Sequence, residues 1–213
     1  MYVSTHHQQS NRDDIFSLME TYPLGAWVCQ ADGALVANHV PFLLDRARGP
    51  FGTLIGHVSR ANPIWRNLHG ATSVVMFQGP QAYITPNWYP SKQEHGKVVP
   101  TWDYAVAHAH GIARPIEDGA WMLDMLSRLT SFHEARQPAP WRVDDAPASY
   151  VDKLLRAIVG IEIPIDRLDA KLKASQDEAM QDRHGTVMGL QRSAGEAEKA
   201  MGNLVMRAID AGA

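Results

Sequence analysis

Short segments in which apolar residues alternate with polar ones, or run together, recur along the chain, and this pattern is typical of β-strands. We predict strands over residues 25–29, 35–44, 51–58, 71–78, 81–85 and 160–165. The stretch 103–116 is long enough for a bent strand, with a bulge or bend at Gly111. Ala31-Asp32-Gly33 predicts a turn, and Gly79-Pro80 predicts a tight link between two of the strands.

Helical spacing is found in fewer places. Residues 10–13 have the spacing of a capping box and predict a short helix that ends near Thr21. Asn62 and Pro63 suit the N-cap and the first position of a short helix that directly follows a strand. Residues 118–135 predict an amphipathic helix whose inward side chains are Trp121, Met122, Met125, Leu126 and Leu129.

The last part of the chain is also helical in character. After a polar, Pro-rich loop a further helix begins near Pro147. From about residue 175 onward the pattern is helical again, although four glycines weaken it: Gly185, Gly189, Gly195 and Gly202.

Strands outnumber long helices and do not alternate regularly with them, so a doubly wound parallel sheet is not expected. We predict a mainly β (α+β) protein: a small closed or split antiparallel β-barrel with peripheral helices. The barrel and its helices are assigned to residues 1–170. Residues 171–213 are assigned to a C-terminal helical segment that packs on the barrel or on a partner subunit.

The composition fits this fold. The chain has 213 residues, of which 45% are hydrophobic and 20% charged, enough to build the core of one large domain or of a domain with a helical appendage. Cys29 is the only cysteine, which excludes an intrachain disulfide and a four-cysteine metal site, and its apolar surroundings predict a buried thiol. We expect neither a signal peptide nor a membrane span, and a cytoplasmic location.

Residues 78–89 and 99–104 gather two Trp, three Tyr and two Thr. A flat ligand such as a flavin needs rings over its faces and hydroxyls at its edge. Trp88 and Trp102 could cover the faces, and Thr85 and Thr101 could bind the edge. The same composition also fits an aromatic hairpin that only packs a core, because strands favour aromatic residues.

A second candidate site is the junction of residues 56–62, where a strand leads into a helix N-terminus. The hydroxyl of Ser59 and the guanidinium of Arg60, together with free backbone N–H groups, could hold a phosphate. An ordinary cap with a surface arginine is the alternative. The glycine-rich fingerprints of dinucleotide and P-loop sites are not found.

A third candidate site consists of Lys173, Ser175 and Gln176. Lys173 could bind an anion, and the other two could form hydrogen bonds with the polar edge of a ring. The alternative is a solvated helix start that Ser175 caps. His108 and His110 are two residues apart on a strand and so share a face, but spacing defines no third ligand, and we predict no metal site. The sequence identifies no nucleophile motif and no general acid or base, so catalytic residues stay unassigned.

Binding to nucleic acid has little support in the residues. The net charge is −3, whereas a DNA-binding domain usually carries a basic excess. In the C-terminal helices Arg183 and Arg192 are accompanied by five acidic residues, so that face would repel phosphates as much as attract them.

In this order, the motifs resemble the PaiB family of FMN-binding negative transcriptional regulators, which share the split barrel of pyridoxamine-phosphate-oxidase-like flavoproteins. The resemblance covers nearly the whole chain. It is carried by residues 56–63, 77–89, 99–104, 140–147, 157–163 and 173–176. It implies an FMN-binding homodimer with each flavin at the subunit interface.

The resemblance also implies roles for individual residues. The residues placed at the phosphate are His57, Ser59, Arg60 and Asn62. Those beside the ring or the ribityl chain are Tyr83, Thr85, Trp88, Thr101 and Trp102. The residues that approach the flavin from the C-terminal part of the chain, in the same or the partner subunit, are Lys173, Ser175 and Gln176.

Three residues depart from the family pattern: Asp103 and Asp177 replace Asn, and Ala174 replaces Leu. We do not assign Asp103 to the flavin, because its carboxylate can only accept hydrogen bonds and would lie unfavourably close to an anionic reduced flavin.

We therefore interpret the chain as an FMN-binding regulator that acts as a homodimer, with DNA binding implied by the family's role rather than by the residues. The alternative is a small FMN-dependent oxidoreductase or flavin reductase of unassigned substrate. A third interpretation is a haem-handling split barrel that uses His108 or His110.

Overall fold

The computed structural model describes residues 1–31, 33–68, 70 and 72–212. Asp32 of the predicted turn and Ala71 at the start of a predicted strand lie outside the described residues. The strands are β1 (Leu24–Ala31), β2 (Ala34–Pro41), β3 (Leu43–Asp45), β4 (Thr53–Ser59), β5 (Thr72–Ile84), β6 (Thr101–Ile112), β7 (Arg114–Ile116) and β8 (Ile158–Lys173).

The α-helices are α1 (Arg12–Thr21), α2 (Ser91–His95), α3 (Gly119–Glu134), α4 (Ala148–Leu155), α5 (Met180–Arg192) and α6 (Glu196–Asp210). Short 3-10 helices are η1 (Thr5–His7), η2 (Pro63–Asn67), η3 (Pro86–Trp88) and η4 (Val143–Asp145). Among the described residues, no helix combines the length and the apolar character that a membrane crossing requires.

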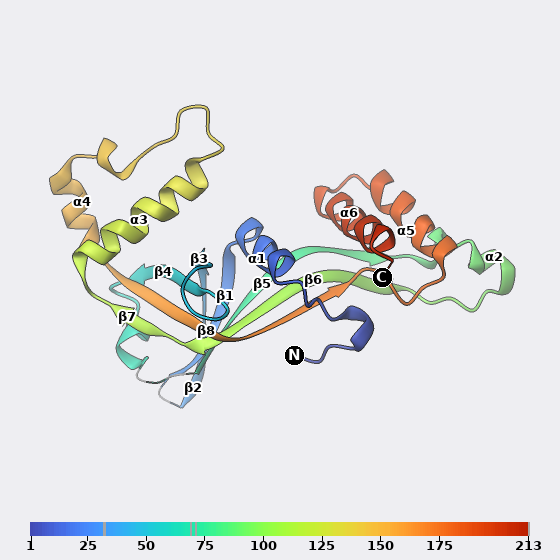
Figure 1. Ribbon diagram of the computed structural model, residues 1–213, viewed down its shortest axis with the longest axis horizontal. Helices are drawn as coiled ribbons and strands as arrows, with labels where there is room; N and C mark the ends of the chain where they lie inside the picture. The colour runs from blue at the N-terminus through green and yellow to red at the C-terminus, as the bar shows by residue number, and fades with distance from the viewer. Residues whose placement is uncertain (32, 69, 71, 213) are drawn as a thin grey trace. The chain divides into compact units, whose positions relative to one another are not determined.

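The strands form one sheet in the order β2-β1-β5-β6-β8-β4-β3, and β7 pairs with β8 (Figure 1). Strand β1 pairs antiparallel with β2 and β5, and β4 pairs antiparallel with β3 and β8. The predicted mainly antiparallel sheet with peripheral helices is confirmed.

The chain divides into two compact units. Unit 1 comprises Met1–Leu18, Gln78–Ala107 and Asp169–Ala213, and unit 2 comprises Met19–Phe77 and His108–Leu168. Strands β5, β6 and β8 contribute residues to both units. The predicted division at residue 170 stays a prediction.

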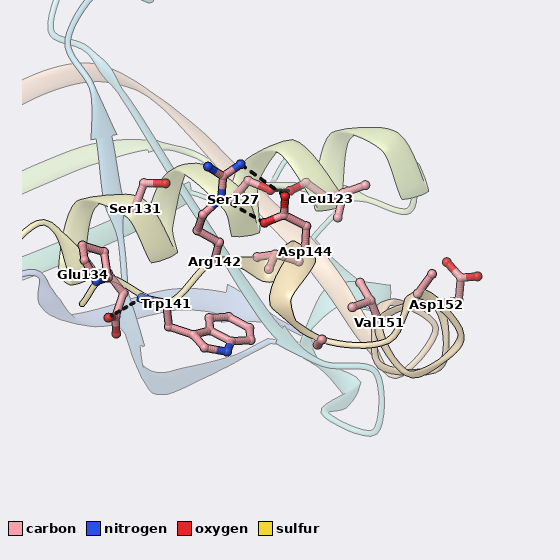
Figure 2. Close-up of a pocket in the computed structure, with 13 residues that line it drawn as sticks. Leu123, Ser127, Ser131, Glu134, Trp141, Arg142, Asp144, Val151 and Asp152 are labelled. Carbon is pink, nitrogen blue, oxygen red and sulfur yellow. Dashed lines mark hydrogen bonds and ion pairs between the residues drawn. The ribbon is translucent and has the colours of Figure 1, made fainter. Parts of the chain in front are cut away.

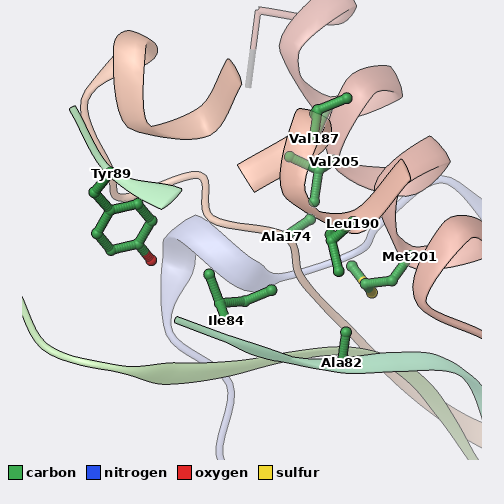
Figure 3. Close-up of a cluster of buried hydrophobic side chains, with 9 residues drawn as sticks. Ala82, Ile84, Tyr89, Ala174, Val187, Leu190, Met201 and Val205 are labelled. Carbon is green, nitrogen blue, oxygen red and sulfur yellow. The ribbon is translucent and has the colours of Figure 1, made fainter. Parts of the chain in front are cut away.

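The core of unit 1 lies between its helices and strand β5. Side chains of β5, α5 and α6 meet in one buried cluster that includes Ile84, Leu190 and Val205 (Figure 3). Helices α5 and α6 lie side by side (Figure 1). A Cβ at Gly202 would lie 3.1 Å from Leu190 Cβ, so this glycine lets the two helices approach closely. Helix packing thus outweighs the low helix propensity of glycine.

The core of unit 2 contains one face of α3. Met125 and Leu129 are buried against Leu43 and Ile55, and Trp121 and Leu126 pack on the same cluster. The side chain of Asp118 caps this helix by accepting a hydrogen bond from the Trp121 N–H (2.7 Å). The predicted inward face of this helix is confirmed.

The prediction of two strands joined through Gly79-Pro80 is wrong, because β5 is continuous over Thr72–Ile84. Buried positions of β5 switch from odd to even residues at Gly79 and Pro80, as they do at a β-bulge. A Cβ at Gly79 would lie 2.6 Å from Leu18 Cδ1 and 3.3 Å from the Ala105 carbonyl oxygen. This glycine therefore serves close packing rather than a turn.

Three other strand boundaries differ from the prediction. The stretch 35–44 is split into β2 and β3, because Phe42 turns its N–H to the Pro23 carbonyl (2.9 Å). The stretch 103–116 is split into β6 and β7 at residue 113, not at Gly111. The strand predicted over 160–165 continues to Lys173, through polar residues that hid its second half.

The predicted helix starts are confirmed, but at one of them a different side chain provides the cap. Asn62 caps η2 by accepting a hydrogen bond from the Ile64 N–H (3.1 Å). Helix α1 ends at Thr21 as predicted, but Asn11 rather than Ser10 accepts a hydrogen bond from its first turn, from the Asp13 N–H (3.0 Å).

Candidate functional site

A buried carboxylate organises the late part of unit 1. Asp103 has no exposed surface. The Ser175 hydroxyl donates to its Oδ2 (2.6 Å), and Lys173 Nζ donates to its Oδ1 (3.3 Å) and to Thr101 Oγ1 (2.5 Å). Burial raises the pKa of Asp103, while the Ser175 hydrogen bond and the Lys173 charge oppose that rise. Asp103 therefore connects three residues that the sequence predicted to bind flavin.

The turn after β8 is fixed by its own side chains. Ser175 has φ 56°, in the left-handed region that residues other than glycine rarely occupy. The Gln176 side chain accepts a hydrogen bond from the Ala174 N–H (2.7 Å) and donates one to the Leu172 carbonyl (2.7 Å). Gln176 thus holds the turn, and Asp103 holds the Ser175 hydroxyl.

An aromatic pair lies on the surface of unit 1. The ring centroids of Tyr83 and Trp102 are 6.2 Å apart with the planes tilted by 58°. Trp102 Nε1 donates a hydrogen bond to Gln81 Oε1 (3.1 Å), which fixes the orientation of the indole. Both residues are about half exposed, at 52% and 48%. Their ring faces are available to a planar ligand.

Trp88 is held by helix α5. Thr85 Oγ1 accepts a hydrogen bond from the Asn87 N–H (3.2 Å) and caps η3, which ends at Trp88. A Cβ at Gly189 would overlap the Trp88 indole, and one at Gly185 would overlap the Trp88 carbonyl oxygen. Sequence reasoning treated these glycines only as helix-weakening. Their i, i+4 spacing, which places them on one helix face, was the available signal for a groove.

In unit 2, Arg60 is engaged by protein acceptors. Its Nε donates to the Arg156 carbonyl (2.9 Å), Nη2 to the Ile158 carbonyl (3.1 Å) and Nη1 to Glu117 Oε2 (2.6 Å). A guanidinium has five N–H donors, so two remain for a ligand. Arg60 joins the end of β4 to the start of β8 whether or not it also meets a phosphate.

The other predicted phosphate residues lie around the same junction. Ser59 Oγ accepts a hydrogen bond from the Ala61 N–H (3.3 Å), and Asn62 Nδ2 donates one to Asn38 Oδ1 (2.8 Å). His57 Nδ1 is buried and has no hydrogen-bond partner among the described residues. Burial lowers the pKa of His57, which favours the neutral ring. This nitrogen is therefore a polar atom of the interior whose hydrogen-bonding capacity is not used by the described residues.

The predicted site residues are divided between the units. Four belong to unit 2: His57, Ser59, Arg60 and Asn62. Eight belong to unit 1: Tyr83, Thr85, Trp88, Thr101, Trp102, Lys173, Ser175 and Gln176. Within unit 1 the structure brings together Lys173, Ser175 and Thr101 around Asp103, and separately Tyr83 and Trp102.

His108 and His110, the two histidines considered as metal ligands, lie on strand β6. The rings of His108 and His110 are 6.5 Å apart, and Arg167 Nη2 lies 3.0 Å from His110 Nδ1. Within residues 1–31, 33–68, 70 and 72–212, no group of three or more His, Cys, Asp or Glu is arranged to hold a metal ion.

Comparison with known proteins identifies the family. Residues 1–167 match the family described as "Putative FMN-binding domain". The chain belongs to this FMN-binding family. An uncharacterised protein of Emericella nidulans is 33% identical over 96% of both chains, and Protease synthase and sporulation protein PAI 2 of Bacillus subtilis is 28% identical over 96% of both.

Solved structures show the fold of this FMN-binding family member. The FAD and heme binding protein from Mycobacterium smegmatis is 23% identical, with a TM-score of 0.60, covering 83% of this chain and 78% of its own. The flavocytochrome Anf3 from Azotobacter vinelandii is 12% identical, with a TM-score of 0.57, covering 80% and 72%. The predicted split barrel is confirmed, and family membership confirms FMN as the cofactor.

The residues present fit FMN. The flat isoalloxazine ring needs exposed aromatic faces, which Tyr83 and Trp102 provide. A phosphate needs donors that the protein has not used, and in unit 2 the two remaining N–H groups of Arg60 meet this requirement. When bound, FMN supplies redox chemistry, and the chain supplies binding and orientation.

Proposed function

We propose that this protein is an FMN-binding transcriptional regulator that acts as a cytoplasmic homodimer with flavin at the subunit interface. The observation that carries the flavin site is the exposed pair of Tyr83 and Trp102 in the same unit as the Lys173–Asp103–Ser175 cluster. The regulatory role rests on the resemblance to the PaiB family and on the similarity to the Bacillus subtilis protein.

Within this proposal the predicted residues act in two ways. Tyr83, Trp88 and Trp102 cover the ring, and Lys173, Ser175 and Thr101 meet its polar edge. Thr85 and Gln176 support them through the turns that they fix. The phosphate is met by His57, Ser59, Arg60 and Asn62.

A second candidate function is a small FMN-dependent oxidoreductase or flavin reductase. The net charge of −3 favours it, because a protein that binds DNA directly needs enough positive charge to neutralise phosphates.

Spectroscopy of the purified protein tests the cofactor site first. We expect absorbance bands between about 350 and 500 nm and release of FMN on denaturation. A colourless protein that does not bind added FMN would contradict both candidate functions. Rapid bleaching by NADH or NADPH under anaerobic conditions supports the reductase.

A mobility-shift titration with DNA from the protein's own promoter tests regulation. Direct DNA binding must weaken steeply as salt increases, because phosphate contacts release counterions. If unrelated DNA removes the shift as effectively as unlabelled promoter DNA does, the binding is not sequence-specific, which would contradict the regulatory role.

A further inference from the structure

A cavity of about 790 Å³ lies in unit 2 between α3, the connection from residue 135 to 147, and α4 (Figure 2). None of the residues predicted to bind flavin lines it. Sites for small organic ligands commonly have volumes of roughly 300–1,000 Å³. This cavity therefore has the size of a second ligand site.

Polar contacts hold the connecting segment in place. Glu134, the last residue of α3, accepts a hydrogen bond from the Trp141 N–H at its Oε2 (3.0 Å). The Asp145 side chain accepts one from the Arg142 N–H (2.8 Å) at the start of η4. The wall formed by Trp141 and Arg142 is thus fixed by the protein itself, and a ligand need not order it.

The lining joins an apolar surface to carboxylates. Leu123, Val143 and Val151 contribute aliphatic side chains, and Trp141 contributes an indole that is 47% exposed. In Figure 2 the indole of Trp141 is drawn between Glu134 on one side and Val151 on the other. An apolar body would find contact here, and the indole face would attract a cation.

The charges of the lining are unequal. Three carboxylates, those of Glu134, Asp144 and Asp152, and one guanidinium, that of Arg142, belong to the lining. Arg142 is already paired with Asp144 through two contacts, Nε to Oδ1 (3.0 Å) and Nη2 to Oδ2 (3.2 Å). Glu134 and Asp152 are left without a cationic partner within the lining. Glu134 also lies at the C-terminal, negative end of the α3 dipole, which favours a cation beside it.

We propose that this cavity binds an organic ammonium ion with a planar or aliphatic apolar body. The body lies against Trp141, and the ammonium group meets the carboxylate of Glu134, which Figure 2 draws beside that residue. The proposal does not depend on the flavin site, so it can fail or succeed separately from the proposed function.

Calorimetric titration of the full-length, FMN-loaded protein with tryptamine tests the proposal. Indole-3-propionate, which has the same ring and a carboxylate instead of an ammonium group, serves as the matched probe. We expect tryptamine to bind at least about fivefold more tightly, because the sign of its charge suits the lining. Equal binding of the two probes, or no binding of tryptamine, would overturn the proposal.

Two conservative variants locate the site. Glu134→Gln keeps an oxygen that accepts the Trp141 N–H but removes the negative charge. Asp152→Asn removes a charge at the opposite end of the cavity, as Figure 2 shows. We expect Glu134→Gln to lose about fivefold or more in tryptamine affinity, whereas Asp152→Asn changes it by less than about twofold. Asp166→Asn, which alters an exposed carboxylate elsewhere in unit 2, should leave the affinity unchanged. Unchanged affinity in the folded Glu134→Gln variant would show that tryptamine binds elsewhere.

Discussion

Asp103 illustrates how a single residue can take a role that its type does not suggest. A fully buried carboxylate is costly unless it is hydrogen-bonded and paired, and Asp103 is held by Ser175 and Lys173. Its two hydrogen-bond partners are 70 and 72 residues away in sequence, so no local pattern could reveal them. The sequence prediction that Asp103 does not bind the flavin stays a prediction, and the structure adds a positioning role.

The titration of Asp103 gives the first prediction. Because burial raises its pKa in the folded state, the folded protein binds the proton more readily than the unfolded chain does. Its contribution to stability is therefore present at low pH and is lost as pH rises through the raised pKa. In urea unfolding between about pH 4 and pH 7, the unfolding free energy of the wild type relative to Asp103→Asn should fall as pH rises. A relative stability that increases with pH would contradict this assignment.

Arg60 gives the second prediction. We expect Arg60→Ala to weaken FMN binding by more than about 1.5 kcal/mol, as expected for loss of a charge-assisted contact. Fluorescence titration of FMN into the apoprotein measures this change. Since Arg60 also donates to two backbone carbonyls, its removal should lower the melting temperature as well.

The control is Glu117→Gln, which weakens the ion pair of Arg60 but keeps the guanidinium. It should leave FMN affinity within about twofold of the wild type, because exposed ion pairs contribute little. If Arg60→Ala lowers the melting temperature and binds FMN as tightly as the wild type, Arg60 is structural only.

At the scale of elements, most strands and helices follow from the sequence, and the errors have local causes. Alternation of apolar residues revealed β1 and much of β5 because one face of each is buried. Strand β4 was revealed by its apolar run, because its first four residues are buried on both faces of the strand. Gly79-Pro80 suggested a turn, since glycine and proline at a bulge cannot be told from those in a tight link. The glycines of α5 lower helix propensity, and only the packed structure shows why they are tolerated.

Of the candidate site, the sequence predicted the residue types but not their partners. The contacts of Arg60 join residues 57 to 98 positions apart, and nothing in a local motif encodes them. The caps at Asn62 and Thr85 are different, because each side chain bonds a backbone group two residues away. Interactions that are short in sequence could thus be predicted, and long-range ones could not.

Helix α5 gives the third prediction. Gly189→Ala places a methyl group in the Trp88 indole, so either the ring or the helix must move. We expect a loss of about 1–3 kcal/mol in the free energy of unfolding, the usual cost of overpacking. Urea unfolding measures this loss, and near-ultraviolet circular dichroism reports the movement of the ring.

A matched substitution separates crowding from helix propensity. Gly119→Ala makes the same chemical change at the start of α3, where nothing lies within 4 Å of the added Cβ. It should be neutral or slightly stabilising, because alanine is the better helix former. A stable Gly189→Ala variant with an unchanged Trp88 signal would show that α5 does not hold the indole.

For the whole molecule, the central question is how the cofactor and the oligomer depend on one another. Family membership confirms FMN binding and the split barrel, while the homodimer with flavin at its interface is our proposal. If residues of both subunits contact FMN, the flavin must bind the dimer more tightly than the monomer. By linkage, each FMN that binds must then strengthen dimerisation by the same factor.

This linkage gives the fourth prediction. Sedimentation velocity over a range of protein concentrations, with and without saturating FMN, should show a dimer dissociation constant that FMN lowers by about tenfold or more. The decrease in the dimer dissociation constant caused by FMN should be smaller in Arg60→Ala if that residue helps to hold the phosphate. The variant then loses a contact to FMN that forms only in the dimer. Riboflavin, which has the same ring without the phosphate, should strengthen dimerisation less than FMN does. An identical dissociation constant with and without FMN would place the whole flavin site within one subunit, and the interface proposal would be wrong even if the protein binds FMN tightly.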